Sequence, residues 1–376
     1  MEKLAVYIHW PYCARICPYC DFNVYKRKVD AALLPAILTD LNHWRDKSGP
    51  REISSIHFGG GTPSLMTAAQ IGAVLETIDT LWGFSVIEIA LEANPHEMDK
   101  ENWRDYRLAG LNRISLGAQS FNDHALAFLG RDHDGRTARR ALDLALEIFP
   151  SVSSDLIFGW AGQSQKALAS DLSILLSAGT PHISTYQLTI EDGTAFAKAE
   201  TRGQKRAVGA DFSADLYERV RETLTAASFD HYEVSNFAKA DHQSQHNLAY
   251  WRGLDYVGVG PGAHGRLTNG AQRQATICHM TPSAYAEAVS VSGTGIDSIE
   301  NLTGAEWATE YLLMGLRIEE GISIARYEAL SGSKLNPSEV GYLIEDSLLE
   351  READRLRATA NGRLVLNSVT ERLLLS

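Results

Sequence analysis

Three cysteines within eight residues are the part of this 376-residue sequence best suited to chemistry. Cys13, Cys17 and Cys20 form a Cys-x-x-x-Cys-x-x-Cys pattern on one short stretch of chain. In a reducing compartment, clustered thiols indicate metal binding more often than disulfides. Four cysteines would saturate a [4Fe–4S] cluster, so three leave one iron open to another ligand. A zinc site would need a fourth ligand, for which His9 is near in sequence, and three structural cysteines are the remaining alternative.

A glycine run is the second chemical feature of the sequence. Gly59-Gly60-Gly61-Thr62-Pro63 follows a short apolar segment. Glycines allow the main chain to approach a small ligand closely, and exposed main-chain groups can hold an ammonium group. Considered alone, the run is weak evidence for a ligand site, and an ordinary tight turn explains it better.

The elements that would position these residues alternate between strands and helices. Short apolar runs rich in β-branched residues predict strands at Leu4–His9, Ile53–Phe58, Val86–Glu92, Arg113–Gly117, Val152–Phe158 and His182–Leu188. Helical periodicity separates them, with Thr67, Asp99 and Ser164 as candidate N-caps. Six such βα units predict an α/β fold with a parallel sheet, a partial (βα)6 TIM-like barrel. Ligands should gather at the carboxyl ends of its strands, which the cysteines, the glycines and several polar residues follow.

The rest of the chain is predicted to form two further parts after the core at 1–200. Residues 201–290 contain a helix at about 207–227 and a glycine-rich stretch, and 290–302 resembles a linker. Residues 301–376 predict helices at Glu306–Leu316, Ile324–Leu330 and Ser338–Glu350. A hairpin through Leu356–Ala358 and Arg363–Leu366 would turn at Asn361-Gly362. This order predicts a small helical, winged-helix-like domain, but its 12 acidic and 8 basic residues favour a packing or lid role over DNA binding.

Composition narrows the class of protein. The net charge of −12, from 47 acidic and 35 basic residues, disfavours a broad nucleic-acid surface. No apolar run is long enough for a transmembrane helix and no secretory segment is recognisable, so we expect a cytoplasmic protein with at most transient membrane contact. Cys278 stands alone, and a lone cysteine is usually a small buried hydrophobic residue.

The stretch from Tyr7 to Phe22, which contains the three cysteines, resembles the signature of radical S-adenosylmethionine (SAM) proteins. More narrowly, it resembles the branch related to oxygen-independent coproporphyrinogen III oxidase, and the resemblance covers essentially the whole chain. It implies a [4Fe–4S] cluster on Cys13, Cys17 and Cys20, with SAM bound to the open iron. The SAM contacts that it implies are Tyr7, Tyr19, Gly60, Gly61, Thr62, Glu92, Gln119, Arg131 and Asp155.

Three features favour the HemW-type haem chaperones within this branch. Phe22 stands where the oxidase carries a further cysteine, and the N-terminal extension of the oxidase is missing before the first strand. His246-Asn247-Leu248-Ala249-Tyr250-Trp251 also matches the His-Asn-x-x-Tyr-Trp motif of the HemW type. The resemblance implies that the chain binds haem, with His246 as a contact, and delivers it to haem proteins such as respiratory ones. It leaves monomer and homodimer both open.

Two other interpretations remain at this stage. A radical SAM enzyme that acts on a porphyrin, such as an anaerobic coproporphyrinogen III oxidase, would use the same cluster. A purely structural cluster protein would bind neither cofactor productively, but the many polar residues at predicted strand ends disfavour it.

Overall fold

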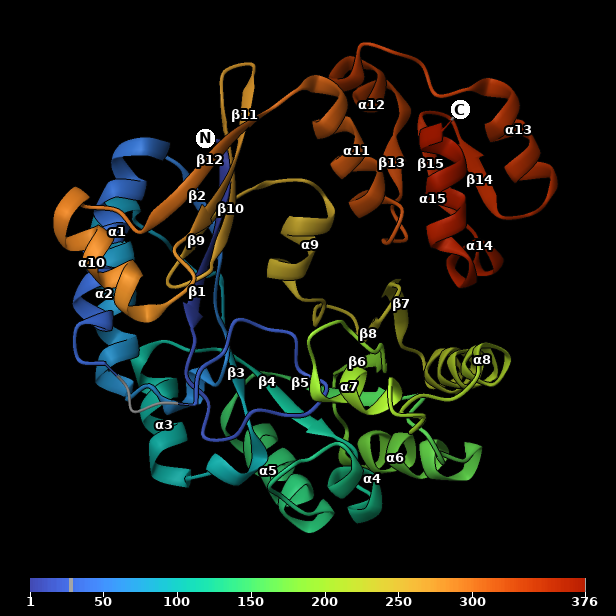
Figure 1. The fold of residues 1–376 in the computed structure, drawn as a ribbon, viewed down its shortest axis with the longest axis horizontal. Coiled ribbons are helices and arrows are strands. Elements are labelled where there is room, and N and C mark those ends of the chain that lie inside the picture. Colours follow the sequence, from blue (N-terminus) through green and yellow to red (C-terminus); the bar gives the residue numbers. More distant parts are fainter. Residues whose placement is uncertain (27–29, 376) are drawn as a thin grey trace.

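A single large sheet organises the computed structural model, which describes residues 1–26 and 30–375. Six strands run parallel and in chain order through its centre (Figure 1). They are β1 (Lys3–Trp10), β2 (Glu52–Gly60), β3 (Glu88–Ala93), β4 (Arg113–Gln119), β5 (Ser151–Phe158) and β6 (His182–Gln187). The sheet curves into a partial barrel, so the predicted (βα)6 fold is confirmed.

Helices cover the outer face of this barrel (Figure 1). The helices of the first half are α1 (Leu33–Ser48), α2 (Ala68–Trp82), α3 (Lys100–Ala109), α4 (Asp123–Phe128), α5 (Gly135–Ile148), α6 (Gln165–Ala178), α7 (Ala195–Glu200) and α8 (Ala210–Ala226). Short 3-10 turns at Pro63–Leu65 and Pro95–Glu97 follow β2 and β3. The predicted caps Thr67, Asp99 and Ser164 each accept a hydrogen bond from a main-chain N–H of the first helical turn.

Strands from later in the chain extend the sheet at both edges. The strand β9 (Asp255–Val259) lies parallel to β1, and β10 (His264–Asn269), β11 (Gln272–Cys278) and β12 (Ile296–Leu302) continue from it in antiparallel order. At the other edge, β8 (Asn236–Ala238) pairs with β6, and β7 (Asp230–Glu233) follows. The helix α9 (Gln245–Trp251) contacts β2 and β9, and α10 (Pro282–Ser292) packs on α1. The predicted linker at 290–302 is therefore wrong, because most of it is the edge strand β12.

The last 70 or so residues form a winged-helix-like unit. Its elements are α11 (Gly304–Gly315), β13 (Ile322–Ser323), α12 (Ile324–Ser331), α13 (Pro337–Glu345), β14 (Leu349–Glu352), β15 (Arg355–Ala358), α14 (Ala360–Leu364) and α15 (Leu366–Leu375). The hairpin joins β14 to β15, so the predicted turn at Asn361-Gly362 is wrong. Gly362 lies in α14 instead, where a Cβ would stand 1.9 Å from the carbonyl oxygen of Leu348.

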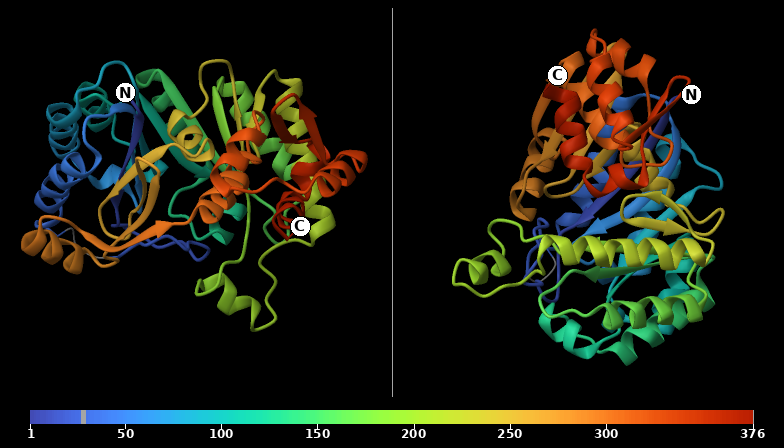
Figure 2. Two further views of the ribbon diagram at one scale, coloured as in Figure 1. Left: turned by 90° about the horizontal axis from the view of Figure 1, so that it is seen from above. Right: turned by 90° about the vertical axis from the view of Figure 1, so that its right-hand side faces the viewer.

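Two of the four buried apolar clusters among the described residues are large. The larger one fills the barrel and its outer helices, and the smaller one lies inside the C-terminal unit. The C-terminal unit packs beside α8 and the β7 end of the sheet (Figure 2), where Arg317 and Glu233 form an ion pair of 2.6 Å. No helix among the described residues has the length and apolar character to cross a bilayer.

Candidate functional site

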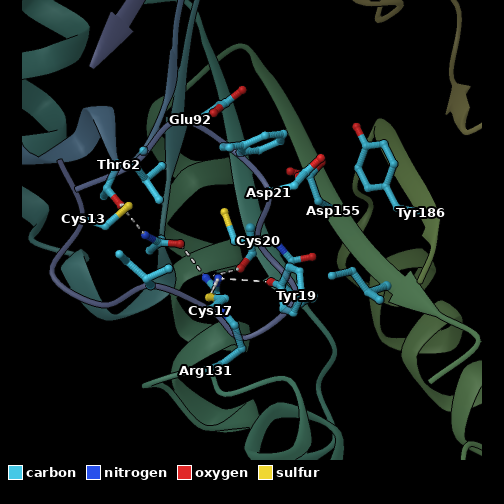
Figure 3. A pocket seen from close by; sticks show the side chains of 18 of the residues that line it. Cys13, Cys17, Tyr19, Cys20, Asp21, Thr62, Glu92, Arg131, Asp155 and Tyr186 are labelled. Carbon is cyan, nitrogen blue, oxygen red and sulfur yellow. Dashed lines mark hydrogen bonds between the residues drawn. The ribbon is translucent and has the colours of Figure 1, made fainter. Parts of the chain in front are cut away.

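The carboxyl ends of β1 to β6 border a cavity of about 360 Å³, which we call the cluster cavity (Figure 3). Parallel strands bring their carboxyl ends to one edge of a barrel, which explains why residues far apart in sequence meet there. Eleven of the thirteen predicted site residues line this cavity: Cys13, Cys17, Tyr19, Cys20, Gly60, Gly61, Thr62, Glu92, Gln119, Arg131 and Asp155. The other two, Tyr7 and His246, lie elsewhere.

The three thiols lie on the loop that follows β1, and two of them accept hydrogen bonds. The Thr62 hydroxyl donates to Cys13 Sγ at 3.4 Å, and Arg131 Nη1 donates to Cys17 Sγ at 3.2 Å. Burial raises the pKa of Cys13, and it raises the pKa of Cys20 to about 11. Without a cation these thiols would stay protonated at neutral pH, whereas a bound metal displaces such protons. Donors aimed at sulfur together with half-buried thiols fit an iron–sulfur cluster.

The groups around the three thiols distinguish a [4Fe–4S] cluster from a zinc ion. Cys13, Cys17 and Cys20 stand at separate points of the cavity wall (Figure 3). Within the described part of the chain, no three histidine, cysteine or carboxylate side chains lie close enough together to hold one metal ion. A structural zinc site takes four protein ligands, and the nearby His9 already pairs with Tyr7 and Asn23, whereas three thiols are what a [4Fe–4S] cluster with one open iron needs.

The glycine run has a packing role as well as a place on the cavity wall. A Cβ on Gly61 would stand 2.7 Å from the main-chain oxygen of Tyr12, and one on Gly60 would stand 2.6 Å from the ring of His9. The N–H groups of Gly60, Gly61 and Thr62 donate to the Glu92 carboxylate and to main-chain oxygens of the loop after β1. The N–H groups of this turn are therefore already paired, and an ammonium group, which only donates hydrogen bonds, could be held here by main-chain carbonyls alone.

Two carboxylates, one on β3 and one on β5, face the cavity. Glu92 accepts hydrogen bonds from Gly60 N–H at 3.3 Å and from His57 Nε2 at 3.0 Å. Asp155 accepts a hydrogen bond of 3.2 Å from the Ser115 hydroxyl, and burial raises its pKa to about 6. These acids are the groups on this wall that could accept hydrogen bonds from the hydroxyl or ammonium groups of a ligand.

The far wall contains a strained residue and a buried guanidinium. Gln119 has a φ of 64°, and its buried Oε1 has no partner among the described residues. Strain and an unsatisfied polar atom in a cavity together point to a missing ligand. Arg131 donates to Gly117 O at 3.1 Å and to Asn94 Oδ1 at 2.5 Å as well as to Cys17, so it orders the cysteine loop.

A second cavity of about 560 Å³ adjoins the first, and we call it the aromatic cavity. The two cavities share Asp21, Phe22, Gly60 and Glu92. Rings from the barrel, from α9 and from α11 line it: Tyr7, Phe22, Tyr250, Trp251, Tyr256, Trp307 and Tyr311. A cavity of this size with seven aromatic side chains on its wall suits a large flat apolar ligand.

His246 is buried behind this cavity and not on its wall. The ring is 1 % exposed, and its two nitrogens pair with the Ser55 hydroxyl at 2.9 Å and the Tyr250 hydroxyl at 2.7 Å. Burial lowers the pKa of His246, so the imidazole is neutral. The ring also stacks on His57 with centroids 4.8 Å apart. In this conformation Tyr250 stands between His246 and the aromatic cavity, so the predicted haem contact would have to be indirect.

Comparisons with known proteins agree with this architecture. Residues 7–173 match the radical SAM superfamily, and residues 302–365 match the HemN C-terminal domain. The heme chaperone HemW of Haemophilus influenzae is 35% identical over 100% of this chain and 98% of its own length. The heme chaperone HemW of Escherichia coli is 34% identical over 100% of this chain and 99% of its own. The chain belongs to the HemW family of radical SAM proteins.

The HemW family extends beyond bacteria and shares its fold with an enzyme. The mitochondrial radical S-adenosyl methionine domain-containing protein 1 of Danio rerio is 36% identical over 99% of this chain and 87% of its own length. The solved structure of coproporphyrinogen III oxidase (HemN) from Escherichia coli superposes with a TM-score of 0.82, at 22% identity, over 99% of this chain and 90% of that one. At that identity the likeness establishes the fold alone.

Sequence reasoning missed several residues of this HemW-family site. Asn94 bridges the two sulfur donors, since its amide donates to Thr62 at 3.1 Å and its oxygen accepts from Arg131. Ser115 and Tyr186 also line or support the cluster cavity beside Asp155. Each of the three lies on or just after a predicted strand, so strand-end position was the available signal. For the aromatic cavity the motif that contains Tyr250 and Trp251 was a signal, but the cavity itself could not be predicted because α9, α11 and β9 to β11 meet only in the folded chain.

Proposed function

We propose that this chain is a haem chaperone, which binds haem and delivers it to haem proteins. The observation that carries the proposal is the aromatic cavity of about 560 Å³ that shares a wall with the cluster cavity. The full-length likeness to proteins named heme chaperone HemW supports the same reading. A macrocycle with a conjugated face would stack on aromatic rings such as Tyr256 and Trp307.

The proposed resident cofactors are a [4Fe–4S] cluster and SAM. Cys13, Cys17 and Cys20 would hold the cluster, as membership of the radical SAM superfamily implies. Bound there, the cluster supplies an open iron and an electron to SAM. Glu92, Asp155 and Gln119 would orient SAM, while Arg131 and Thr62 keep the sulfurs in place by donating hydrogen bonds to them.

Haem transfer tests this proposal directly. The protein would be reconstituted with iron and sulfide without oxygen, loaded with haem, and mixed with an excess of an apo-haem protein such as apomyoglobin. We expect stoichiometric haem binding, followed by appearance of the acceptor's own optical spectrum. A chain that binds no haem, or binds it and never releases it to an acceptor, contradicts the chaperone function.

A radical SAM enzyme acting on a porphyrin is the second candidate function. The specific observation in its favour is that Gly60, Glu92 and Phe22 face both cavities, so a ligand in one could contact a ligand in the other. Protoporphyrinogen formed without oxygen from coproporphyrinogen, SAM and a reductant would replace the chaperone proposal. Formation of the product should then disappear in Cys17→Ala.

The proposed partners are haem-accepting proteins, including respiratory ones, and not nucleic acids. The net charge of −12 supports the exclusion of nucleic acids as partners, because polyanions repel an acidic surface. We propose a cytoplasmic protein that contacts membranes only transiently. Light scattering of the reconstituted protein with and without haem would distinguish a monomer from a homodimer.

A further inference from the structure

Imidazole and thioether side chains are common ligands of haem iron in proteins. The aromatic cavity has four of them on its wall: His9, His264, Met280 and Met314. Two conditions select among them, because a ligand must have a free donor atom and must be able to reach the iron without rearrangement of the fold.

His9 does not meet these conditions. Its ring is 6 % exposed, Nδ1 pairs with the Tyr7 hydroxyl at 3.1 Å and Nε2 pairs with the Asn23 carbonyl at 3.0 Å. His246 does not meet them either, since both of its nitrogens are bonded and Tyr250 separates it from the cavity.

His264 meets both conditions. It is the first residue of β10, and its side chain is exposed. None of residues 1–26 and 30–375 forms a hydrogen bond with its ring. The strand fixes its direction, because side chains alternate along a strand and His264 shares the cavity face with Arg266. Gly265 between them faces the opposite side, where a Cβ would stand 2.6 Å from Thr276 Oγ1.

We propose that His264 is the protein ligand of the haem iron, with the macrocycle in the aromatic cavity. This inference rests on the proposed chaperone function and names the residue that would coordinate its cargo. Met280 and Met314, which are 50% and 36% exposed, border the same space and give it adaptable apolar surface for a ligand that must later leave.

His246 then acts through Tyr250 as a positioning residue. Its Nε2 holds the Tyr250 hydroxyl at 2.7 Å, and the Tyr250 ring meets that of Tyr256 edge-on with centroids 4.4 Å apart. Trp251, the next residue, packs against Arg317 with the guanidinium carbon 4.6 Å from the ring centroid. The His-Asn-x-x-Tyr-Trp motif therefore builds one aromatic wall of the cavity without giving a ligand to the iron.

The charges on the cavity wall indicate how haem would lie. Arg266 pairs with Glu310 at 2.7 Å, and Arg273 pairs with Asp255 at 2.8 Å. Because these guanidinium groups already have carboxylate partners, they leave no unpaired charge to draw haem propionates inward. We expect the propionates to point to solvent, with the apolar edge of the macrocycle among the rings.

Haem titration of the cluster-reconstituted protein tests the assignment through its optical and electron paramagnetic resonance spectra. The variants are His264→Ala, His246→Gln and Tyr250→Phe. The control is His279→Ala, because His279 lies nearby on the surface, pairs with Asp297 at 3.2 Å and is not on the cavity wall.

We expect His264→Ala to lose the histidine-ligated spectrum and to weaken haem binding by about tenfold or more, and added imidazole to restore the spectrum. His246→Gln and Tyr250→Phe should keep that spectrum with a smaller loss of affinity, and His279→Ala should match the wild type. An unchanged spectrum in His264→Ala, or its loss in His246→Gln, overturns the assignment while the chaperone function stands. A wild-type protein that binds no haem overturns the chaperone function itself.

Discussion

Replacing Asp155 by asparagine should stabilise the fold and weaken ligand binding at the same time. Burial raises the pKa of Asp155 from its ordinary value of 3.8 to about 6. That difference corresponds to about 3 kcal/mol of unfavourable free energy for the ionised side chain at neutral pH. Asp155 faces the open cavity, where water screens part of this cost. We therefore expect Asp155→Asn to raise the free energy of unfolding by about 1–2 kcal/mol at pH 8.

The sign of the pH dependence follows from linkage. Between the ordinary pKa of 3.8 and the folded pKa of about 6, the native state holds a proton on Asp155 that the unfolded chain has released. The wild-type protein therefore gains stability from this group as the pH falls through 6. The advantage of Asp155→Asn should be full at pH 8 and should shrink towards zero near pH 4.

Urea unfolding at a series of pH values would measure this difference. Asp143→Asn is the matched control, because Asp143 is 53% exposed and forms only a surface ion pair with Arg139. Equilibrium dialysis with SAM should show weaker binding in Asp155→Asn, since an amide has one neutral acceptor oxygen where a carboxylate offers two charged ones to hydroxyl or ammonium groups. A stability difference that is the same at pH 5 and pH 8 would refute the reasoning about burial.

Three further substitutions test the cluster loop and the C-terminal unit. Gly61→Ala would put a methyl group 2.7 Å from a main-chain oxygen, and we expect about 1–3 kcal/mol lower stability and poor iron and sulfide incorporation. Thr62→Val removes the donor to Cys13 Sγ at 3.4 Å, which should lower the reduction potential of the cluster by roughly 20–60 mV in a redox titration. Arg317→Met leaves the fully buried Glu233 carboxylate without its cation, and urea unfolding should show a loss of about 3 kcal/mol.

Each of these changes has a control in the chain. Gly72→Ala lies in α2 with nothing within 4 Å of its Cβ, so it should be neutral or stabilising. Thr62→Ser keeps the hydroxyl and should keep the reduction potential. Arg252→Met breaks an ion pair with Glu320 whose partners are 38% and 46% exposed, and it should cost less than about 1 kcal/mol. A control that behaves like its test variant would contradict the corresponding argument.

The central barrel could be predicted from the sequence because its strands are buried on both faces. The burial of β1 makes it a nearly continuous apolar run, β5 ends in the apolar residues Leu156-Ile157-Phe158, and the caps before α2, α3 and α6 mark where helices begin. The added strands gave no such signal. Gly258 and Gly265 lie in β9 and β10, where a Cβ would stand 2.1 Å from His264 O and 2.6 Å from Thr276 Oγ1. Their glycines resemble those of a loop, although close packing is what requires them.

The edge strand β12 is a second element that the sequence pattern does not predict. Its sequence, Ile296 to Leu302, is mostly polar and exposed, because one edge of the sheet ends there and nothing covers either face. Without a buried face, a strand has no alternation of apolar and polar residues to reveal it. The sequence of this segment therefore resembles a linker, and it does not reveal the edge of the sheet.

One part of the candidate site could be predicted from the sequence, and the other part could not. Side chains near the carboxyl ends of parallel strands, such as Glu92 in β3 and Asp155 in β5, could be placed together from the sequence because strand order fixes where they meet. A cavity between elements from distant parts of the chain depends on tertiary packing, which no local pattern encodes. The aromatic cavity is of this second kind, so its ring from α11 and its histidine from β10 went unnoticed.

A motif therefore identifies the family of this chain more securely than it identifies the task of each residue. The glycines at 59–61 look like a ligand-binding turn, yet their missing side chains make room for the ring of His9 and for the backbone of the cysteine loop. His246 looks like an iron ligand, yet its nitrogens hold Ser55 and Tyr250. Gly60 and Gly61 thus allow close packing as well as lining the cluster cavity, whereas His246 lies behind the aromatic cavity and contacts its wall through Tyr250. Selection on the shape of a cavity wall would preserve a motif as strictly as selection on direct contact with the ligand would. Comparison of His264→Ala with His246→Gln separates these two roles.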